Sequence, residues 1–133
     1  MSGAGAFRAA VVARDADAMR ATLAPDVVFH SPVTFRAFEG RDVVGHVLAT
    51  VAEVFEDFRY TDQLREGTTT ILVFRARVAG REVDGIDLLR EDADGLIADF
   101  TVMVRPLSGL TALAEEMGRR LGAAPPPPVP PAP

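Results

Sequence analysis

Apolar and polar side chains alternate most regularly between residues 68 and 78, where Arg75 separates Phe74 from Ala76. A period of two residues predicts a strand with one buried face. Three nearby segments show the same alternation less regularly, with glycine-containing turns between them. We therefore predict four consecutive antiparallel strands, at residues 58–66, 68–78, 82–90 and 96–105.

Helical periodicity is clearest between residues 42 and 57, where apolar residues recur at spacings of three and four. This spacing predicts an amphipathic helix with one buried face. The same spacing predicts a shorter packing helix from Leu107 to Leu121.

The N-terminal region is predicted to contain two helices and a strand. The first helix covers residues 7–13, and the second covers residues 16–23, with Asp15 as its N-cap and Pro25 as its stop. Residues 26–30 are β-branched and aromatic, which favours a short strand.

This order of elements predicts an α+β domain with helices on one face of a curved antiparallel sheet. Such a sheet, wrapped around the long helix, encloses a conical cavity, which is the default ligand site. We assign the domain to residues 1–122. Residues 123–133 contain 7 of the 10 prolines and are predicted to be a disordered tail. A polyproline II rod that docks on a partner is the alternative for this tail.

Composition excludes several kinds of chemistry. The chain has no Cys and all 14 of its positive residues are Arg, which excludes disulfides, thiolate catalysis and lysine bases. With only 2 His, we expect no metal, and we expect no cofactor. A net charge of −5 without a basic run argues against a nucleic-acid partner. Arg8 interrupts the only apolar N-terminal stretch, so we expect a cytoplasmic protein with no membrane partner.

Three stretches carry a resemblance to a known family: LAPDVVF at residues 23–29, FEGRDVV at residues 38–44 and DGLI at residues 94–97. Together with Gly80 and Asp87, they make the chain similar to the nuclear transport factor 2-like superfamily, and within it to the SnoaL-like group. The resemblance covers nearly the whole predicted domain. It implies a cone-shaped α+β barrel, a fold shared by isomerases, cyclases, dehydratases, epoxide hydrolases and non-catalytic binding modules.

The catalytic positions of that superfamily transfer only in part. The resemblance places Ser31 where ketosteroid isomerases of this fold have their base Asp, and Phe7 where they have their oxyanion-hole Tyr. Asp87 matches their oxyanion-hole Asp. Limonene-type epoxide hydrolases use an Asp-Arg-Asp set, for which the resemblance again offers Asp87, with Gly85 and Val102 at the other two positions. Neither mechanism is implied in complete form.

The same matching of positions, together with strand alternation, indicates which side chains face the cavity. Asp87 is the carboxyl among them, and apolar surroundings raise the pKa of a carboxyl so that it can donate a proton. The alternative is a rim carboxylate that is hydrogen-bonded to the backbone or paired with a nearby Arg. The other expected ligand-binding residues are apolar: Phe29, Leu72, Phe74, Ala76, Val78, Leu89, Phe100, Val102 and Val104.

His30 and Ser31 are the further candidates for catalysis. Strict alternation turns His30 to the outer face of the sheet, unless Pro32 swings it inward to form an acid–base pair with Asp87. Ser31 faces the cavity without an identified base, so it either binds a ligand or caps a turn. Tyr60 is expected near the sheet edge or the cavity mouth, with a solvated hydroxyl.

We therefore expect a pocket for an apolar small molecule, polyketide- or steroid-like, in which Asp87, with His30 or Ser31, performs cofactor-free acid–base chemistry of the cyclase or isomerase type. The alternative is a non-catalytic ligand-binding or accessory domain that has lost the catalytic residues. Members of this fold commonly dimerise through the outer face of the sheet. Because that face carries apolar residues here, such as Ile71 and Ile86, a homodimer is expected.

Overall fold

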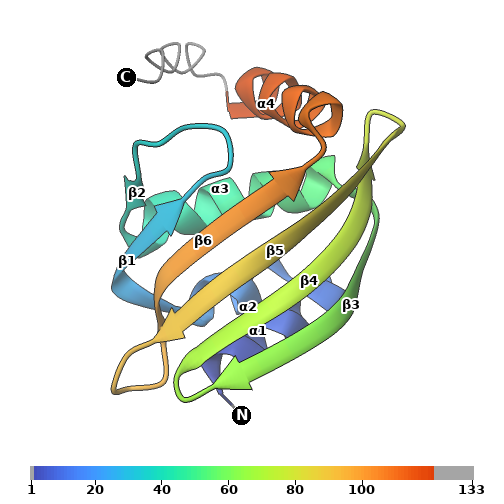
Figure 1. Cartoon of the computed structure of the whole chain (residues 1–133). Coiled ribbons are helices and arrows are strands. Elements are labelled where there is room, and N and C mark those ends of the chain that lie inside the picture. The colour runs from blue at the N-terminus through green and yellow to red at the C-terminus, as the bar shows by residue number, and fades with distance from the viewer. Residues whose placement is uncertain (1, 122–133) are drawn as a thin grey trace, which may run out of the picture.

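Within residues 2–121, which the computed structural model describes, six strands form one sheet and four helices cover one of its faces (Figure 1). The tail predicted at residues 123–133 lies outside the described residues. The helices are α1 (Gly3–Val12), α2 (Ala16–Ala21), α3 (Arg41–Val54) and α4 (Leu107–Leu121). The strands are β1 (Leu23–His30), β2 (Phe38–Glu39), β3 (Glu56–Glu66), β4 (Thr69–Val78), β5 (Arg81–Glu91) and β6 (Ile97–Arg105).

The predicted α+β class is confirmed, with one difference in the sheet. The strand order is β2-β1-β6-β5-β4-β3, and the four strands from β3 to β6 form the predicted antiparallel meander. β1, however, pairs in parallel with β6, so the sheet is mixed. A parallel pair needs a long connection, which the segment containing α3 and the meander supplies.

Alternation along β4 and β5 orients the inner face as predicted. Leu72 and Phe74 on β4 are buried, whereas Arg75, the residue after Phe74, is exposed. Asp87 on β5 lies directly opposite Leu72, so the two side chains share the inner face. The period of two therefore places the carboxyl of Asp87 between apolar neighbours on the inner face.

Three predicted boundaries in the N-terminal region are wrong. The first helix begins at Gly3 and not at residue 7. The second helix ends at Ala21 and not at Leu23, and β1 begins before Pro25. Pro25 is tolerated in the strand because the pairing of β1 with β6 is irregular between Leu23 and Val28. The expected residues 26–30 are thus only the second part of β1.

The long helix also ends earlier than its periodicity predicts, at Val54 and not at residue 57. Phe55 continues the apolar spacing of the helix but has an extended backbone, and its ring packs 5.4 Å from those of Phe58 and Phe74. Contact with the sheet therefore takes Phe55 out of the helix, and Glu56 becomes the first residue of β3.

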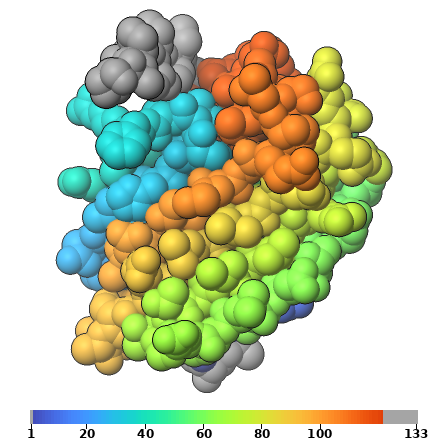
Figure 2. All heavy atoms as spheres, in the orientation of Figure 1, coloured from blue at the N-terminus to red at the C-terminus, as the bar shows by residue number. Residues whose placement is uncertain are grey.

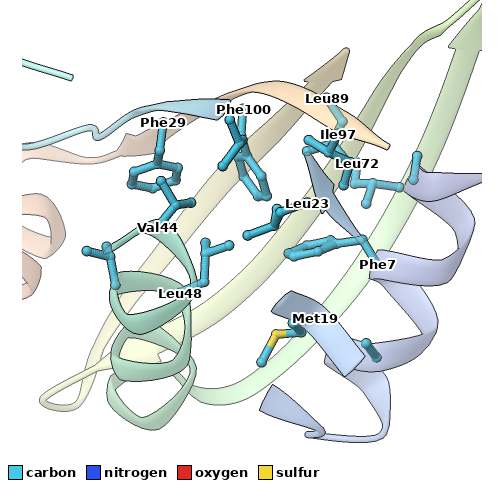
Figure 3. Packing of buried hydrophobic residues seen from close by; sticks show 14 residues of the cluster. Phe7, Met19, Leu23, Phe29, Val44, Leu48, Leu72, Leu89, Ile97 and Phe100 are labelled. Carbon is cyan, nitrogen blue, oxygen red and sulfur yellow. The ribbon is translucent and has the colours of Figure 1, made fainter. Parts of the chain in front are cut away.

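The core lies between the helices and the inner face of the sheet, in two adjoining clusters. One cluster contains the T-shaped ring pairs of Phe100 with Phe7 and with Phe29, at centroid distances of 5.1 and 5.3 Å. Figure 3 shows these rings and Leu48 converging from β1, β6, α1 and α3. The second cluster gathers side chains of β4, β5 and α4 around Phe74.

Within residues 2–121, no helix covers the outer face of the sheet, whose strands make up the central part of the surface in Figure 2. Ile71 and Ile86 are half-buried on this face, and Met103 is 56% exposed. Ion pairs such as Arg75–Asp84 lie among them. The homodimer expected through this face stays a prediction. Among the described residues, none of the helices has the length and apolar character needed to cross a membrane.

Gly85 allows close packing between β5 and its neighbours. It lies opposite Phe74, whose ring covers the glycine, and a Cβ at this position would collide with that ring and lie 2.7 Å from the carbonyl oxygen of Met103. We expect Gly85→Ala to lower the free energy of unfolding by about 2–3 kcal/mol, measured by chemical denaturation. The control is Gly118→Ala in α4, where no atom would meet the added Cβ. This control should instead stabilise the protein by about 0.5–1 kcal/mol. Equal effects of the two changes would contradict the packing argument.

Candidate active site

A cavity of about 600 Å³ opens between the helices and the inner face of the sheet, where the two core clusters meet. Its walls are apolar over most of their area, and the polar groups are few. Apolar lining comes from Phe7, Val11, Val12, Met19, Phe29, Pro32, Val33, Val47, Leu48, Val51, Ala52, Phe55, Phe58, Phe100, Val102, Leu113 and Met117. Polar lining comes from Arg8, Arg14, Ser31, Asp57, Arg59, Tyr60 and Asp87.

Asp87 is a buried carboxyl in the wall of this cavity. It is 6% exposed and lies between Leu72 and Val102 on the neighbouring strands. Burial raises the pKa of Asp87 from 3.8 to about 7, and the hydrogen bond from Tyr60 partly opposes this rise. Near neutral pH the group is therefore divided between its neutral and ionised forms, so it can both accept and donate a proton.

Tyr60 on β3 is the polar partner of Asp87. Its hydroxyl donates a long hydrogen bond to Oδ2 of Asp87, with an oxygen–oxygen distance of 3.5 Å. Burial raises the pKa of the Tyr60 phenol well above its ordinary value, and the nearby Asp87 carboxylate raises it further. Tyr60 therefore remains a hydrogen-bond donor throughout the physiological pH range.

Three arginines line the same cavity as Tyr60. The guanidinium carbon of Arg8 lies 5.3 Å from the centre of the Tyr60 ring, within cation–π range. Arg14 and Arg59 also line the cavity, and both are exposed. Asp57 lies with them but forms an ion pair with Arg77.

The predicted ligand-binding residues divide by depth. Phe29, Phe100 and Val102 line the cavity, as expected. The five predicted ligand-binding residues on β4 and β5 do not line it, because Phe7, Phe58 and helix α4 pack over them. These residues were expected in the cavity wall but belong to the filled core: Leu72, Phe74, Ala76, Val78 and Leu89.

His30 does not reach Asp87. Its side chain lies on the outer face, where Nε2 is 3.2 Å from Oδ2 of Asp99 on β6. It lines a second, smaller hollow of about 300 Å³ and not the main cavity. The possibility that Pro32 swings His30 inward is therefore wrong, because β1 stays regularly paired with β6 at His30.

Ser31 lies where β1 ends and lines both hollows. Its Oγ accepts a hydrogen bond from the backbone N–H of Val33 at 3.0 Å, which leaves the hydroxyl proton free to donate. Val104, also expected in the cavity, lines only the smaller hollow. A catalytic role for Asp87, Ser31 or His30 stays a prediction.

Tyr60 is the site residue that the sequence reasoning undervalued. It is the only Tyr in the chain and lies on the least regular of the four strand segments. Two irregularities interrupt the pairing of β3 with β4 near Tyr60. Alternation alone therefore could not show that its hydroxyl points to Asp87.

The site offers no obvious metal ligands. Within residues 2–121, no three or more Asp, Glu or His side chains are grouped so that they could hold a metal ion. The chemistry that the described side chains themselves can supply is proton transfer by Asp87 and hydrogen-bond donation by Tyr60 and Ser31.

Comparison with known proteins agrees with this fold. A steroid delta-isomerase structure from Pseudomonas aeruginosa is 48% identical, with a TM-score of 0.87 over 90% of this chain and 89% of that one. An uncharacterized protein with a cystatin-like fold from Silicibacter pomeroyi is 34% identical, with a TM-score of 0.87 over 91% of this chain and 86% of that one. No curated protein matches the chain. The sequence profile of the SnoaL-like domain family matches residues 4–100. The chain therefore belongs to the SnoaL-like domain family.

Proposed function

We propose that this protein is a cofactor-free isomerase that acts on an apolar, steroid-like ketone, with Asp87 as the group that moves the proton. The observation that carries the proposal is the buried Asp87 carboxyl, with its pKa raised to about 7, in the wall of a mostly apolar cavity. A proton-transfer group works best when its pKa is close to the working pH. The similarity to a structure described as a steroid delta-isomerase favours isomerisation over ring closure.

The proposed reaction moves one proton between two carbons of a β,γ-unsaturated ketone. Ionised Asp87 removes a proton from the carbon between the carbonyl and the double bond. The electron pair of that C–H bond then forms the dienolate, with the negative charge on the ketone oxygen. Protonated Asp87 returns the proton to the γ carbon, which yields the conjugated ketone and regenerates the carboxylate. The reaction consumes no oxidant, reductant or other co-reactant.

Two hydroxyl groups support this reaction in the proposal. Because Oγ of Ser31 already accepts the N–H of Val33, its own proton can be donated to the developing oxyanion. Tyr60 donates to Asp87 and so orients the carboxylate. Tyr60 also limits the rise in the pKa of Asp87 that burial causes.

A second candidate is a non-catalytic domain that binds apolar molecules. It is favoured by Phe7 and Ser31, which line the cavity where ketosteroid isomerases are expected to have a Tyr and a base Asp. In that case the cavity binds the steroid ketone, but no double bond moves.

The pH dependence of turnover tests the isomerase proposal. A β,γ-unsaturated steroid ketone is incubated with the protein, and the conjugated product is followed by its ultraviolet absorbance. We expect turnover to rise with pH up to about 7, as Asp87 ionises. Tyr60→Phe removes a hydrogen bond that lowers the pKa of Asp87, so it should move this profile to higher pH and reduce turnover at neutral pH about tenfold.

Thr61→Val is the matched control for Tyr60→Phe. It removes an exposed hydroxyl from the same strand, and turnover and its pH profile should not change. A complete absence of turnover, or a rate that does not vary with pH, would overturn the isomerase proposal. If Tyr60→Phe instead moves the pH profile to lower pH, Tyr60 does not lower the pKa of Asp87 as proposed.

A further inference from the structure

The charge at the cavity differs in sign from the charge of the chain. The whole chain carries −5, yet the charged residues that line the cavity outside Asp87 are three arginines and one aspartate. The aspartate, Asp57, is neutralised by its ion pair with Arg77 on β4. Arg8, Arg14 and Arg59 therefore form a positive rim on an apolar cavity.

These three arginines lack the carboxylate partners that many other arginines have. Seven arginines form ion pairs with Asp or Glu within residues 2–121, and none of the three rim arginines is among them. A guanidinium that is not paired with a carboxylate keeps its full charge available for a ligand.

Two of the rim arginines are held in place by neutral groups. Arg8 donates from NH1 to Oε1 of Gln63 at 2.6 Å and lies over the Tyr60 ring. Arg59 donates to the backbone carbonyl of Asp57 at 3.2 Å. Neutral acceptors fix the position of each guanidinium without cancelling its charge, and most of its five N–H donors remain unused. This arrangement suits the bidentate binding of a carboxylate.

Tyr60 connects this rim with the reacting group. Its ring is in contact with Arg8, and its hydroxyl is bonded to Asp87. A ligand that lies along Tyr60 therefore meets a cation at one end and the buried carboxyl at the other. The apolar wall of the same cavity includes Phe58 and Val51.

We propose that the ligand of this cavity is an apolar acid, whose carboxylate is bound by Arg8, Arg14 and Arg59 while its apolar body extends to Asp87. This inference names the substrate class for the function proposed above and rests on that function. It adds a requirement that the isomerase proposal does not contain, because an uncharged steroid ketone has no group for the rim.

Equilibrium binding of a matched pair of ligands tests the inference without any turnover. The probes are a conjugated steroid ketone whose side chain ends in a carboxylate, and the methyl ester of the same acid. Calorimetry on the full chain should show that the acid binds about tenfold more tightly than the ester at low salt. The preference should shrink as salt is added, because exposed charges are screened.

Substitution of the rim arginines should remove the preference and leave ester binding in place. Arg14→Gln and Arg59→Gln change exposed side chains, so these variants should fold, and each should reduce the preference severalfold. The triple change that includes Arg8→Gln should bring acid and ester to equal affinity. Arg90→Gln, an exposed arginine on β5 that does not line the cavity, is the control and should keep the tenfold preference.

The outcomes separate this inference from the proposed function. Equal affinity of wild type for acid and ester, or an equal loss in Arg90→Gln and Arg14→Gln, overturns the apolar-acid ligand even where the ketone is isomerised. A clear preference for the acid without isomerisation of either unsaturated compound supports the anionic ligand and overturns the isomerase. Failure of both probes to bind overturns both.

Discussion

Asp87→Asn should reduce the isomerisation of a β,γ-unsaturated steroid ketone by about a thousandfold, the usual loss when the group that transfers the proton is removed. The amide has nearly the shape of the carboxyl, and its oxygen can still accept the hydrogen bond from Tyr60. It cannot take up a proton from carbon at neutral pH. The loss should therefore appear in kcat, whereas the affinity for the conjugated product should change little.

The control for this change is Asp26→Asn, which makes the same substitution at an exposed position of β1. Its turnover should match that of the wild type. Turnover that survives in Asp87→Asn would show that another group moves the proton. Product binding without turnover in either protein would instead support the non-catalytic domain.

The free energy of unfolding should fall as pH rises through the range in which Asp87 ionises. The ordinary pKa of an Asp carboxyl, which we take for the unfolded state, is 3.8, whereas the pKa of Asp87 in the folded protein is about 7. The folded state therefore binds the proton more tightly than the unfolded state does. The resulting stabilisation is fully present below pH 3.8 and is lost as pH rises to about 7. A difference of about three pKa units corresponds to about 4 kcal/mol.

The measurement is a comparison of the wild type with Asp87→Asn by chemical denaturation across this pH range. Surface carboxylates titrate in both proteins, so their contributions largely cancel in the difference. Relative to the variant, the wild type should lose about 3–4 kcal/mol between pH of about 4 and pH of about 7. A difference that does not vary with pH would mean that Asp87 titrates as an exposed carboxyl does.

These two results would be linked by one cause. The apolar neighbours that make the Asp87 anion unfavourable also bring its pKa close to neutrality, where a carboxyl can accept and return a proton. The carboxylate that removes the proton is thus the form that the fold holds least favourably. In such a protein, the ionised active-site carboxyl lowers the free energy of unfolding at neutral pH.

Much of the fold could be predicted because it depends on local periodicity. Alternation along β4 identified the inner face, and the α+β class followed from the order of the elements. The errors occurred where tertiary contacts override local preference. Phe55 leaves the helix to pack on Phe58 and Phe74, and Pro25 occupies an irregular part of β1.

The face to which each site residue points could be predicted, but whether the residue lines the cavity or fills the core could not. Alternation turned Asp87 inward and His30 outward, since successive side chains of a strand point to opposite faces. It could not show that Leu72, Phe74 and Leu89 are covered by other side chains, because inward residues can line a cavity or fill a core.

The amino-acid sequence by itself determined which side-chain chemistry is available and which residues of each strand point inward. It also determined the order of helices and strands, which is that of the family. These properties depend on residue type and on a period of two or of three to four. Only the tertiary structure decided that Tyr60 contacts Asp87 and that Arg8, Arg14 and Arg59 share the cavity rim. Those residues come from α1, the α1–α2 turn, β3 and β5. No local rule relates such distant segments, and their contact follows from how the sheet curves against the helices.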